Sequence, residues 1–272
     1  FVVNSSMMKF CVQPANILGL LAIVAILHTP FVLKSAKANF PDYANDVSAN
    51  LPAVNNNGPF RIIYDSLRLS AKGLASEAFD NAIAGYTILR ENGELDKDDI
   101  LTIADFTQLS SQKRLFVIDL KNCKLLYNTY VAHGENSGKG MATLFSNKNE
   151  SLQSSPGFYV TAGTFDGKHG FSMKLKGMEK NINDKAEERG IIMHSANYVS
   201  ETFIRSHGYL GRSWGCPAVS KEMNKPIISK IKNGSCLFIY SKCKNYFKQS
   251  ALLKSVSVIT PGKTIDQVKC NI

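Results

Sequence analysis

Residues 190–219 of the sequence read GIIMHSANYVSETFIRSHGYLGRSWGCPAV, and this stretch carries most of the information on fold and chemistry. An apolar run that ends in His194 is typical of a buried strand and places an imidazole at the rim of a sheet. Cys216 stands between a glycine and a proline, which is typical of a tight turn with an exposed thiol. We expect a fold that brings Cys216 and His194 together, because such a pair can act as a nucleophile and its base.

The chemistry of such a pair depends on the charge of the sulfur. An imidazolium beside a thiol lowers the pKa of the thiol and populates the thiolate, which is the reactive form. The backbone N–H groups of Gly215 and Cys216 can then form an oxyanion hole. Cysteines and histidines that follow strand-like sequence are also common in purely structural positions, so the residues alone leave both interpretations open.

Short runs rich in β-branched and aromatic residues predict the strands of the fold. Their spacing favours an antiparallel sheet over β-α-β units, so the fold class is α+β, mainly β, as an antiparallel sandwich or barrel. Residues 134–156 predict an extended loop, and loops of that length often bind ligands or cover sites. Residues 197–207 and 220–233 predict short helices, the second interrupted near Pro226. The predicted strands are Ile100–Phe106, Leu115–Leu120, Leu125–Ala132, Phe158–Phe165, Gly190–His194 and Cys236–Tyr240.

The segment before the first predicted strand has a different pattern. Phe79, Ile83, Tyr86 and Leu89 recur at helical spacing, so residues 59–98 predict a small helical unit packed on the main domain. The main domain is expected over residues 99–250. Residues 39–58 are rich in Asn, Ala and Pro and predict a linker, and residues 251–272 form a C-terminal tail.

The first 38 residues have the pattern of an export signal. Lys9 precedes the apolar run Ile17–Leu27, and the stretch ends in Ser35-Ala36-Lys37-Ala38. A positive start, an apolar core and an Ala-x-Ala end predict a secretory signal peptide that is cleaved after Ala38. An uncleaved anchor is the alternative, although a spanning helix needs about 20 apolar residues. We therefore expect a periplasmic or secreted protein that meets the membrane only through this segment.

The composition narrows the class of protein further. The 272 residues are 44% hydrophobic with a net charge of +10, which excludes a collagen-like or disordered chain and suits an anionic partner. Removal of residues 1–38 also removes Cys11, and the odd number of remaining cysteines leaves at least one thiol unpaired in an oxidising compartment. The pairing of the cysteines other than Cys216 stays open, including a Cys236–Cys243 bridge; they are Cys123, Cys236, Cys243 and Cys270.

Other candidate sites have less support. The sequence contains no Gly-rich nucleotide loop and no zinc-type spacing of Cys and His, so no metal or cofactor is expected. The basic residues are scattered, which argues against nucleic-acid binding. His133 either lines a substrate site or hydrogen-bonds the following loop, and the two interpretations are equally supported. His169 and His207 are interpreted as a surface turn and a helix end, and residues 184–189 as a solvated charged face.

The pair His194-Ser195 and the later stretch at residues 213–219 together resemble the signature of the L,D-transpeptidase catalytic domain, the YkuD-like family. The similarity is closest to its second branch, the murein L,D-transpeptidase catalytic-domain proteins. Residues 128–134, 156–160 and 190–200 also agree with that branch, and the resemblance extends from about residue 60 to residue 250. Two positions depart from the family pattern: Trp214 replaces a histidine, and Pro217-Ala218 stands where a hydrophobic residue and an arginine are usual.

The resemblance implies a role for each matching residue. Cys216 would be the nucleophile, and His194 would be its general base and later the proton donor to the leaving amine. The backbone carbonyl of Ser195 would orient the imidazole, and Gly215 with Cys216 would bind the oxyanion. The implied substrate-binding residues are His133, Ser213, Trp214 and Arg212, the last in place of the family's usual arginine.

The resemblance also implies an activity. The protein would be an exported cysteine acyltransferase that forms a thioester with peptidoglycan stem peptides and makes 3→3 cross-links. Two alternatives remain: an L,D-carboxypeptidase or endopeptidase that uses the same site, and a non-catalytic cell-wall-binding protein. The sequence indicates neither the acyl acceptor nor the oligomeric state.

Overall fold

A computed structural model of the protein describes residues 58–254. The predicted signal peptide at residues 1–38 lies outside the described residues, as do nearly all of the predicted linker, most of the predicted tail and Cys270. Within the described part, the helices are all too short or too polar to cross a membrane.

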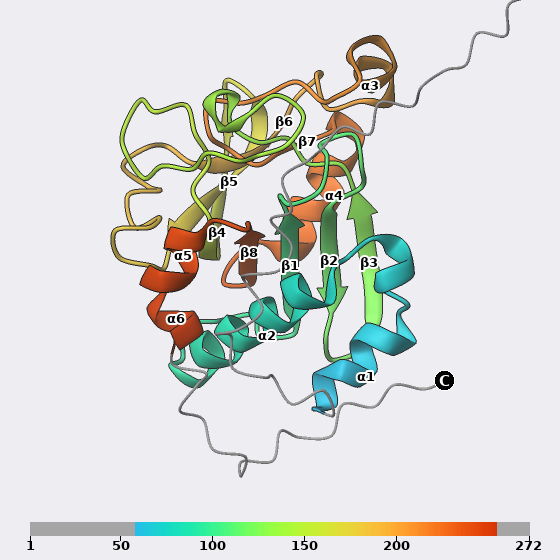
Figure 1. The fold of residues 1–272 in the computed structure, drawn as a ribbon, viewed down its shortest axis with the longest axis vertical. Coiled ribbons are helices and arrows are strands. Elements are labelled where there is room, and N and C mark those ends of the chain that lie inside the picture. The colour runs from blue at the N-terminus through green and yellow to red at the C-terminus, as the bar shows by residue number, and fades with distance from the viewer. Residues whose placement is uncertain (1–57, 255–272) are drawn as a thin grey trace, which may run out of the picture. The chain divides into compact units, whose positions relative to one another are not determined.

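Strands and helices follow one another along the chain as the β-rich pattern predicts (Figure 1). The strands are β1 (Ile100–Asp105), β2 (Leu115–Asp119), β3 (Lys124–Thr129), β4 (Gly157–Gly167), β5 (Gly170–Gly177), β6 (Ile192–Ser195), β7 (Ala218–Val219) and β8 (Cys236–Tyr240). The α-helices are α1 (Pro59–Ser66), α2 (Ser76–Glu91), α3 (Glu201–His207), α4 (Lys221–Ile231), α5 (Lys244–Gln249) and α6 (Ala251–Lys254).

All the described strands belong to one sheet, in the order β3-β2-β1-β8-β4-β5-β6-β7. Five of the pairings are antiparallel, whereas β1–β8 and β6–β7 are parallel. Beyond the end of β3, Ala132 bridges Ala218 of β7, and Gly134 bridges Ser213. The two ends of the sheet therefore meet and nearly close a barrel. This arrangement confirms the predicted α+β, mainly β, barrel-like class.

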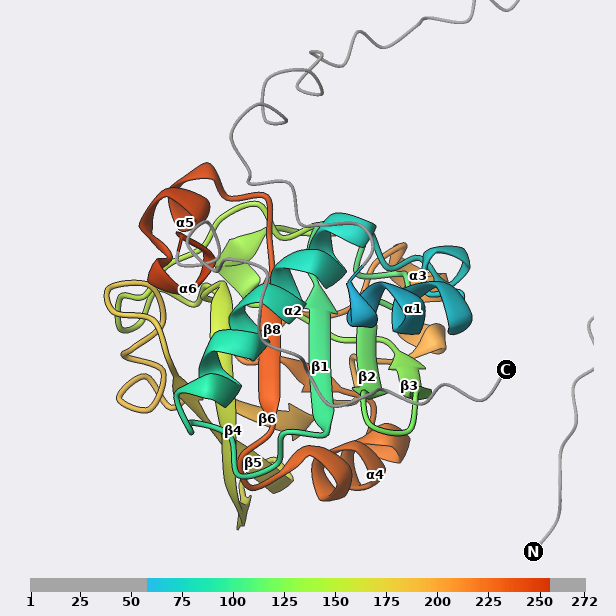
Figure 2. The same cartoon turned by 90° about the horizontal axis from the view of Figure 1, so that it is seen from below.

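The central strands are buried because the sheet is covered on both faces. Every residue of β1, β2 and β8 is buried. Successive side chains of a strand point to opposite faces. In β8, Phe238 packs in the cluster that contains α2, whereas Leu237 and Ile239 pack in the cluster that contains α4. Figure 2 shows α2 crossing β1 and β8 on one face of the sheet.

Helix α2 presents the predicted apolar stripe to the sheet. Phe79, Tyr86 and Leu89 are buried and belong to the same hydrophobic cluster as residues of β1 and β8, while Ile83 is partly buried. Gly85 lies on this stripe and faces the ring of Phe158. The helix therefore approaches the sheet closely, at a point where a side chain would not fit.

Replacing Gly85 with alanine is expected to lower the free energy of unfolding by about 1–3 kcal/mol. The added Cβ would collide with the ring of Phe158, which itself stacks on Phe238 with ring centroids 4.2 Å apart. Urea denaturation followed by circular dichroism measures the effect. The matched control is Gly163→Ala, because nothing lies within 4 Å of a Cβ built at Gly163. Equal urea midpoints for Gly85→Ala and Gly163→Ala would contradict this prediction, because they would show that α2 can move away from Phe158 without loss of stability.

Three details of the secondary structure differ from the sequence-based expectation. The short strand β7 and the Lys-containing strand β5 are not predicted by the apolar pattern. The predicted interruption at Pro226 is wrong, since α4 continues through it. Pro226 is exposed, so the carbonyl that loses its helical partner can be hydrated. The predicted loop at residues 134–156 is present, apart from a short 3₁₀ helix at Glu135–Ser137.

Candidate active site

Cys216 and His194 belong to neighbouring segments at one end of the sheet. In the parallel register of β6 and β7, His194 pairs with Ala218, and Cys216 stands two residues before that pair, in the turn that precedes β7. The backbone N–H of Ile192, two residues before His194, lies close enough to the Cys216 thiol to lower its pKa. The turn with the thiol and the strand with the imidazole therefore come together near the end of the sheet labelled β6 and β7 in Figure 1.

Cys216 is half-buried, and its sulfur is a free thiol. Its Sγ donates to the Gly190 carbonyl oxygen at 3.7 Å. Among the described residues, no hydrogen bond joins Cys216 to His194 in this conformation. Burial raises the pKa of the Cys216 thiol, whereas the Ile192 N–H and the Arg189 guanidinium act in the opposite direction. In this conformation the thiol therefore bonds to the Gly190 carbonyl, and burial favours its protonated form.

The His194 ring is only 3% exposed and has a defined tautomer. Its Nδ1 lies 2.9 Å from the Ser195 carbonyl oxygen. A carbonyl can only accept a hydrogen bond, so Nδ1 carries the proton and Nε2 has a free lone pair. Burial lowers the pKa of His194, the positive charge of His169 lowers it further, and the Ser195 carbonyl opposes both. The neutral imidazole is the form that can accept a proton.

The turn that precedes β7 is held by hydroxyl groups. Ser213 Oγ donates to the Cys216 carbonyl oxygen at 2.6 Å and accepts from the Gly215 N–H at 3.1 Å. Ser154 Oγ donates to the Gly215 carbonyl oxygen at 2.9 Å. Gly215 has a φ of +125° and lies against the Gln153 carbonyl, so an L side chain would be strained there. The Gly215 N–H, which the motif suggested as an oxyanion donor, is thus bonded to Ser213 Oγ, and Ser213 fixes the conformation of the turn.

Trp214 and Arg212 remain near the surface of the site. The Trp214 side chain is 68% exposed, and Lys168 Nζ lies 5.1 Å from its ring centroid. Arg212 is half-buried, and its Nη1 donates to the Glu135 carbonyl oxygen at 3.4 Å. Both residues flank the Cys216 turn, where a substrate can reach them.

His133 does not line a substrate site. It is fully buried; Arg114 Nη2 donates to its Nδ1 at 2.7 Å, and its Nε2 donates to the Gly138 carbonyl oxygen at 3.0 Å. Burial, followed by the charge of Arg114, lowers the pKa of His133 to about 4. With both nitrogens bonded to protein groups, His133 holds the loop that follows it. The sequence left two interpretations of His133 open, and these contacts support the one in which it hydrogen-bonds the following loop.

Arg189 is a site residue that the sequence-based interpretation missed. It was expected on a solvated face, but its guanidinium is half-buried and lies close enough to Cys216 to lower the pKa of the thiol. The same guanidinium fixes the long loop by donating to the Ser146 carbonyl, Ser155 Oγ, Ser151 Oγ and the Gln153 carbonyl. In the sequence, Arg189 stands directly before the predicted strand Gly190–His194, and this position could have indicated that it lies near the site.

His169 is the second residue that the sequence-based interpretation missed. It lies in the exposed turn between β4 and β5, as expected, but its ring stacks on His194 with centroids 4.3 Å apart and planes at 26°. Its carbonyl oxygen accepts from Ser195 Oγ at 3.2 Å. No sequence signal indicates this contact, because it depends on how β5 and β6 pair.

Replacing Arg189 with alanine is expected to move the pH dependence of Cys216 alkylation to higher pH. The guanidinium lowers the pKa of the thiol, so its removal leaves a less acidic sulfur. The rate of iodoacetamide labelling at Cys216, followed by peptide mass spectrometry across pH, measures the midpoint. Arg189→Lys keeps the positive charge, so its labelling midpoint should lie between those of the unmodified protein and Arg189→Ala. Arg205→Ala, on the exposed side of α3, should match the unmodified protein; an unchanged midpoint in Arg189→Ala would contradict the electrostatic role.

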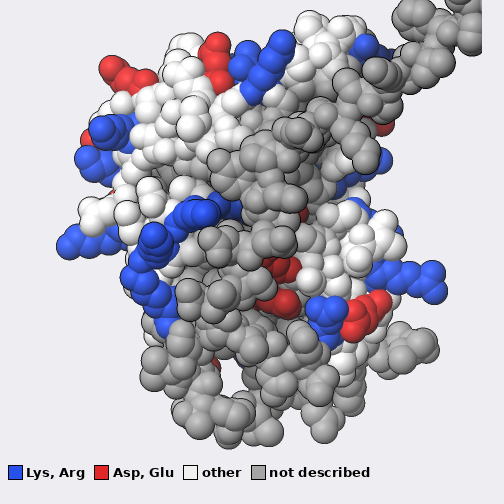
Figure 3. All heavy atoms as spheres, viewed as in Figure 1, with Lys and Arg blue, Asp and Glu red and all other residues white. Residues whose placement is uncertain are grey.

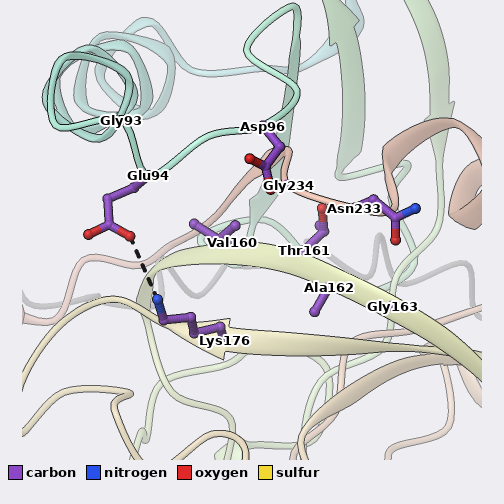
Figure 4. Close-up of a pocket in the computed structure, with 10 residues that line it drawn as sticks. All are labelled: Gly93, Glu94, Asp96, Val160, Thr161, Ala162, Gly163, Lys176, Asn233 and Gly234. Carbon is purple, nitrogen blue, oxygen red and sulfur yellow. Dashed lines mark ion pairs between the residues drawn. The ribbon is translucent and has the colours of Figure 1, made fainter.

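A hollow of about 490 Å³ lies elsewhere on the protein, against β4 (Figure 4). Lys176 and Glu94 form an ion pair at 3.6 Å in this hollow. None of its lining residues belongs to β6, the Cys216 turn or the β4–β5 turn, so it is separate from the site. Across residues 58–254, no cluster of three or more His, Cys, Asp or Glu side chains could hold a metal ion.

Solved structures that match this chain come from several bacteria. An L,D-transpeptidase from Mycobacterium smegmatis is 13% identical with a TM-score of 0.34; the match covers 53% of this chain and 59% of that one. An L,D-transpeptidase from Stackebrandtia nassauensis is 16% identical with a TM-score of 0.32, over 67% and 76%. The helical cell shape determining protein Pgp2 from Campylobacter jejuni is 15% identical with a TM-score of 0.37, over 65% and 61%. The chain thus spans less than two thirds of the Mycobacterium smegmatis structure.

None of the curated proteins matches this chain in sequence. The model of the YkuD_2 family, described as the L,D-transpeptidase catalytic domain, matches residues 70–240. That range contains all eight strands of the sheet and both residues of the Cys216–His194 pair. Because the match extends over more than half of the sequence, the chain belongs to the L,D-transpeptidase catalytic domain family.

Proposed function

We propose that the protein is an exported cysteine L,D-transpeptidase that acts on peptidoglycan stem peptides in the periplasm or outside the cell. Residues 1–38 direct export, and residues 99–250 carry the catalytic domain. Family membership supports transpeptidase activity on peptidoglycan. One observation supports the mechanism above all: a free thiol in the turn before β7 lies beside β6, which carries an imidazole whose Nδ1 donates to a backbone carbonyl and leaves Nε2 as the proton acceptor.

The acylation step uses both side chains. Cys216 Sγ leaves the Gly190 carbonyl by rotation about its Cα–Cβ bond and passes its proton to Nε2 of His194. The thiolate attacks the amide carbonyl of the third stem-peptide residue, at its L-centre, and the Cys216 N–H donates to the developing oxyanion. His194, held through Nδ1 by the Ser195 carbonyl, returns the proton to the amine of the departing D-Ala. The C–N bond breaks and a thioester remains on Cys216.

Deacylation decides which product forms. When an amine of a second stem peptide attacks the thioester, His194 takes its proton, the thiol is restored and a 3→3 cross-link results. When water attacks, the same steps release a tripeptide, which is the carboxypeptidase outcome. A wall-binding role without catalysis would suit a paired or inert Cys216, whereas the free and half-exposed sulfur supports catalysis.

The cysteines support an oxidising location. Cys123 is disulfide-bonded, and disulfides persist mainly in exported proteins. Cys236 and Cys243 are both free thiols, so the bridge between them that the sequence left open is not formed. Figure 3 shows Lys and Arg side chains at several separate places on one face, with Asp and Glu between them. Scattered charge of this kind supports a wall polymer more than a nucleic acid.

Incubation of the purified protein with disaccharide-tetrapeptide fragments of peptidoglycan tests the proposal. Mass spectrometry should detect cross-linked dimers that have lost one D-Ala. Tripeptide fragments without dimers would identify a hydrolase at the same site. Unchanged tetrapeptides, in a preparation that still binds isolated sacculi, would reject catalysis in favour of a wall-binding role.

A further inference from the structure

The turn between β4 and β5 lies at the end of β6 that carries His194. The two strands of the hairpin pair as far as Gly167 and Gly170, which leaves Lys168 and His169 at the tip. Strand β5 then pairs antiparallel with β6, with Met173 opposite Met193. Moving back along β5 from this pair therefore moves forward along β6, past His194 and Ser195, so the tip lies near this end of β6.

Three contacts connect His169 with His194 through this arrangement. The two rings stack with centroids 4.3 Å apart. Ser195 Oγ donates to the His169 carbonyl oxygen at 3.2 Å, while the Ser195 carbonyl accepts the His194 Nδ1–H at 2.9 Å. Ser195 thus links the backbone of one histidine to the ring of the other, and the plane of the His194 ring is fixed from its face and from its edge.

We propose that His169 is a positioning residue for His194, holding the imidazole in the plane in which it can accept the proton of Cys216. This inference rests on the proposed transpeptidase mechanism. The same turn also contacts the other side of the site, because Lys168 Nζ lies over the exposed Trp214 ring. The hairpin tip therefore spans from the base to the turn that carries the nucleophile.

The electrostatic part of the proposal follows from the groups around His194. The hairpin presents the His169 ring, the turn before β7 presents the neutral Cys216 thiol, and β6 itself presents the Ser195 carbonyl. Arg189 directs its guanidinium to the long loop beside Cys216. Among the described residues, His169 is the ionisable group whose charge acts on His194, and it lowers the pKa of that ring in addition to the effect of burial. Two adjacent imidazolium ions would repel each other.

Two substitutions separate the stacking from the charge. His169→Phe keeps a flat ring over His194 and removes the charge, whereas His169→Ala removes both. His207→Phe is the matched control, because His207 is also exposed and stacks on a ring, that of Phe203, at 4.0 Å. Thermal melts followed by circular dichroism establish that the variants are folded, as expected for substitutions in an exposed turn.

The closing experiment is an NMR titration of the His194 imidazole in the full chain, with histidine labelled with ¹⁵N and the signal assigned through His194→Gln. His169→Phe should raise the pKa of His194, and His207→Phe should leave it unchanged. In the cross-linking assay, His169→Phe should move the acid limb of kcat/KM to higher pH, and His169→Ala should also lower kcat about tenfold with little change in KM. An unchanged His194 titration in His169→Phe would overturn the inference. The titration needs no turnover, so a shifted pKa in a protein that transfers no acyl group would reject the proposed function and retain the coupling.

Discussion

Replacing Cys216 with alanine is expected to abolish acyl transfer and to remove the covalent adduct that a carbapenem forms with the unmodified protein. The proposed mechanism proceeds through a bond to Cys216 Sγ, and neither its backbone N–H nor His194 can replace that atom. Loss of a nucleophile of this kind lowers turnover by at least about 10³-fold. Intact-mass spectrometry after incubation with the carbapenem measures the adduct, and the tetrapeptide assay measures the cross-linking.

The matched control for this prediction is Cys243→Ser. Cys243 is also a free, half-buried thiol, but it precedes α5 and lies outside the β6–β7 site. This variant should keep both the adduct and the cross-linking activity. An adduct that survives in Cys216→Ala and disappears in Cys243→Ser would move the nucleophile to the C-terminal part of the chain.

Replacing His194 with glutamine is expected to lower kcat/KM by about 10²- to 10⁴-fold, the usual contribution of a general base. Glutamine is polar and of similar size, but it cannot take the proton of Cys216 and return it to the leaving amine. In the unmodified protein, the acid limb of kcat/KM should lie below about pH 6.5, because burial and His169 lower the pKa of His194 and the base stays neutral to lower pH. The residual kcat/KM of His194→Gln should not show this decrease at acid pH.

His207→Gln is the control for this variant, because it changes an exposed histidine at the end of α3, whose ring bonds to the Phe203 carbonyl of the same helix. It should retain the full rate and the full pH profile. If His194→Gln kept its rate within threefold, a different group would have to accept the proton. The stacked ring of His169 would then be the first candidate, and His194→Gln combined with His169→Phe would test it.

The sequence predicted most of the sheet because its central strands are apolar and separated by clear turn residues. The predicted ranges for β1, β2 and β8 agree with the structure to within a residue at each end. It did not predict β7, because this strand has only two residues and is too short to show an alternating pattern. Its position comes from pairing with β6 on one side and with Ala132 on the other. The expectation that Cys216 and His194 share one catalytic site came from the residues and the motif; it stays a prediction, which the β6–β7 register supports by pairing His194 with Ala218.

The roles of the surrounding residues were harder to predict, because they depend on contacts between segments far apart in the chain. Buried polar groups need partners. Ser213 meets this requirement by donating to the Cys216 carbonyl, and His133 meets it by hydrogen bonds with Arg114 and the Gly138 carbonyl. The same requirement occupies the Gly215 N–H, which the motif suggested as an oxyanion donor. His169 and Arg189 reach the site through a hairpin register and a loop, neither of which a linear pattern reveals.

The position of β8 has a consequence for how the protein is made. Within residues 58–254 it is the last strand in sequence order, yet it lies between β1 and β4 and joins the two halves of the sheet. A chain that has emerged only as far as the reactive cysteine lacks this piece, so the two halves cannot yet join. Long-range pairing of this kind slows folding. Completion of the sheet is thereby postponed until residue 240 is present, so a shorter chain cannot bring its two halves together.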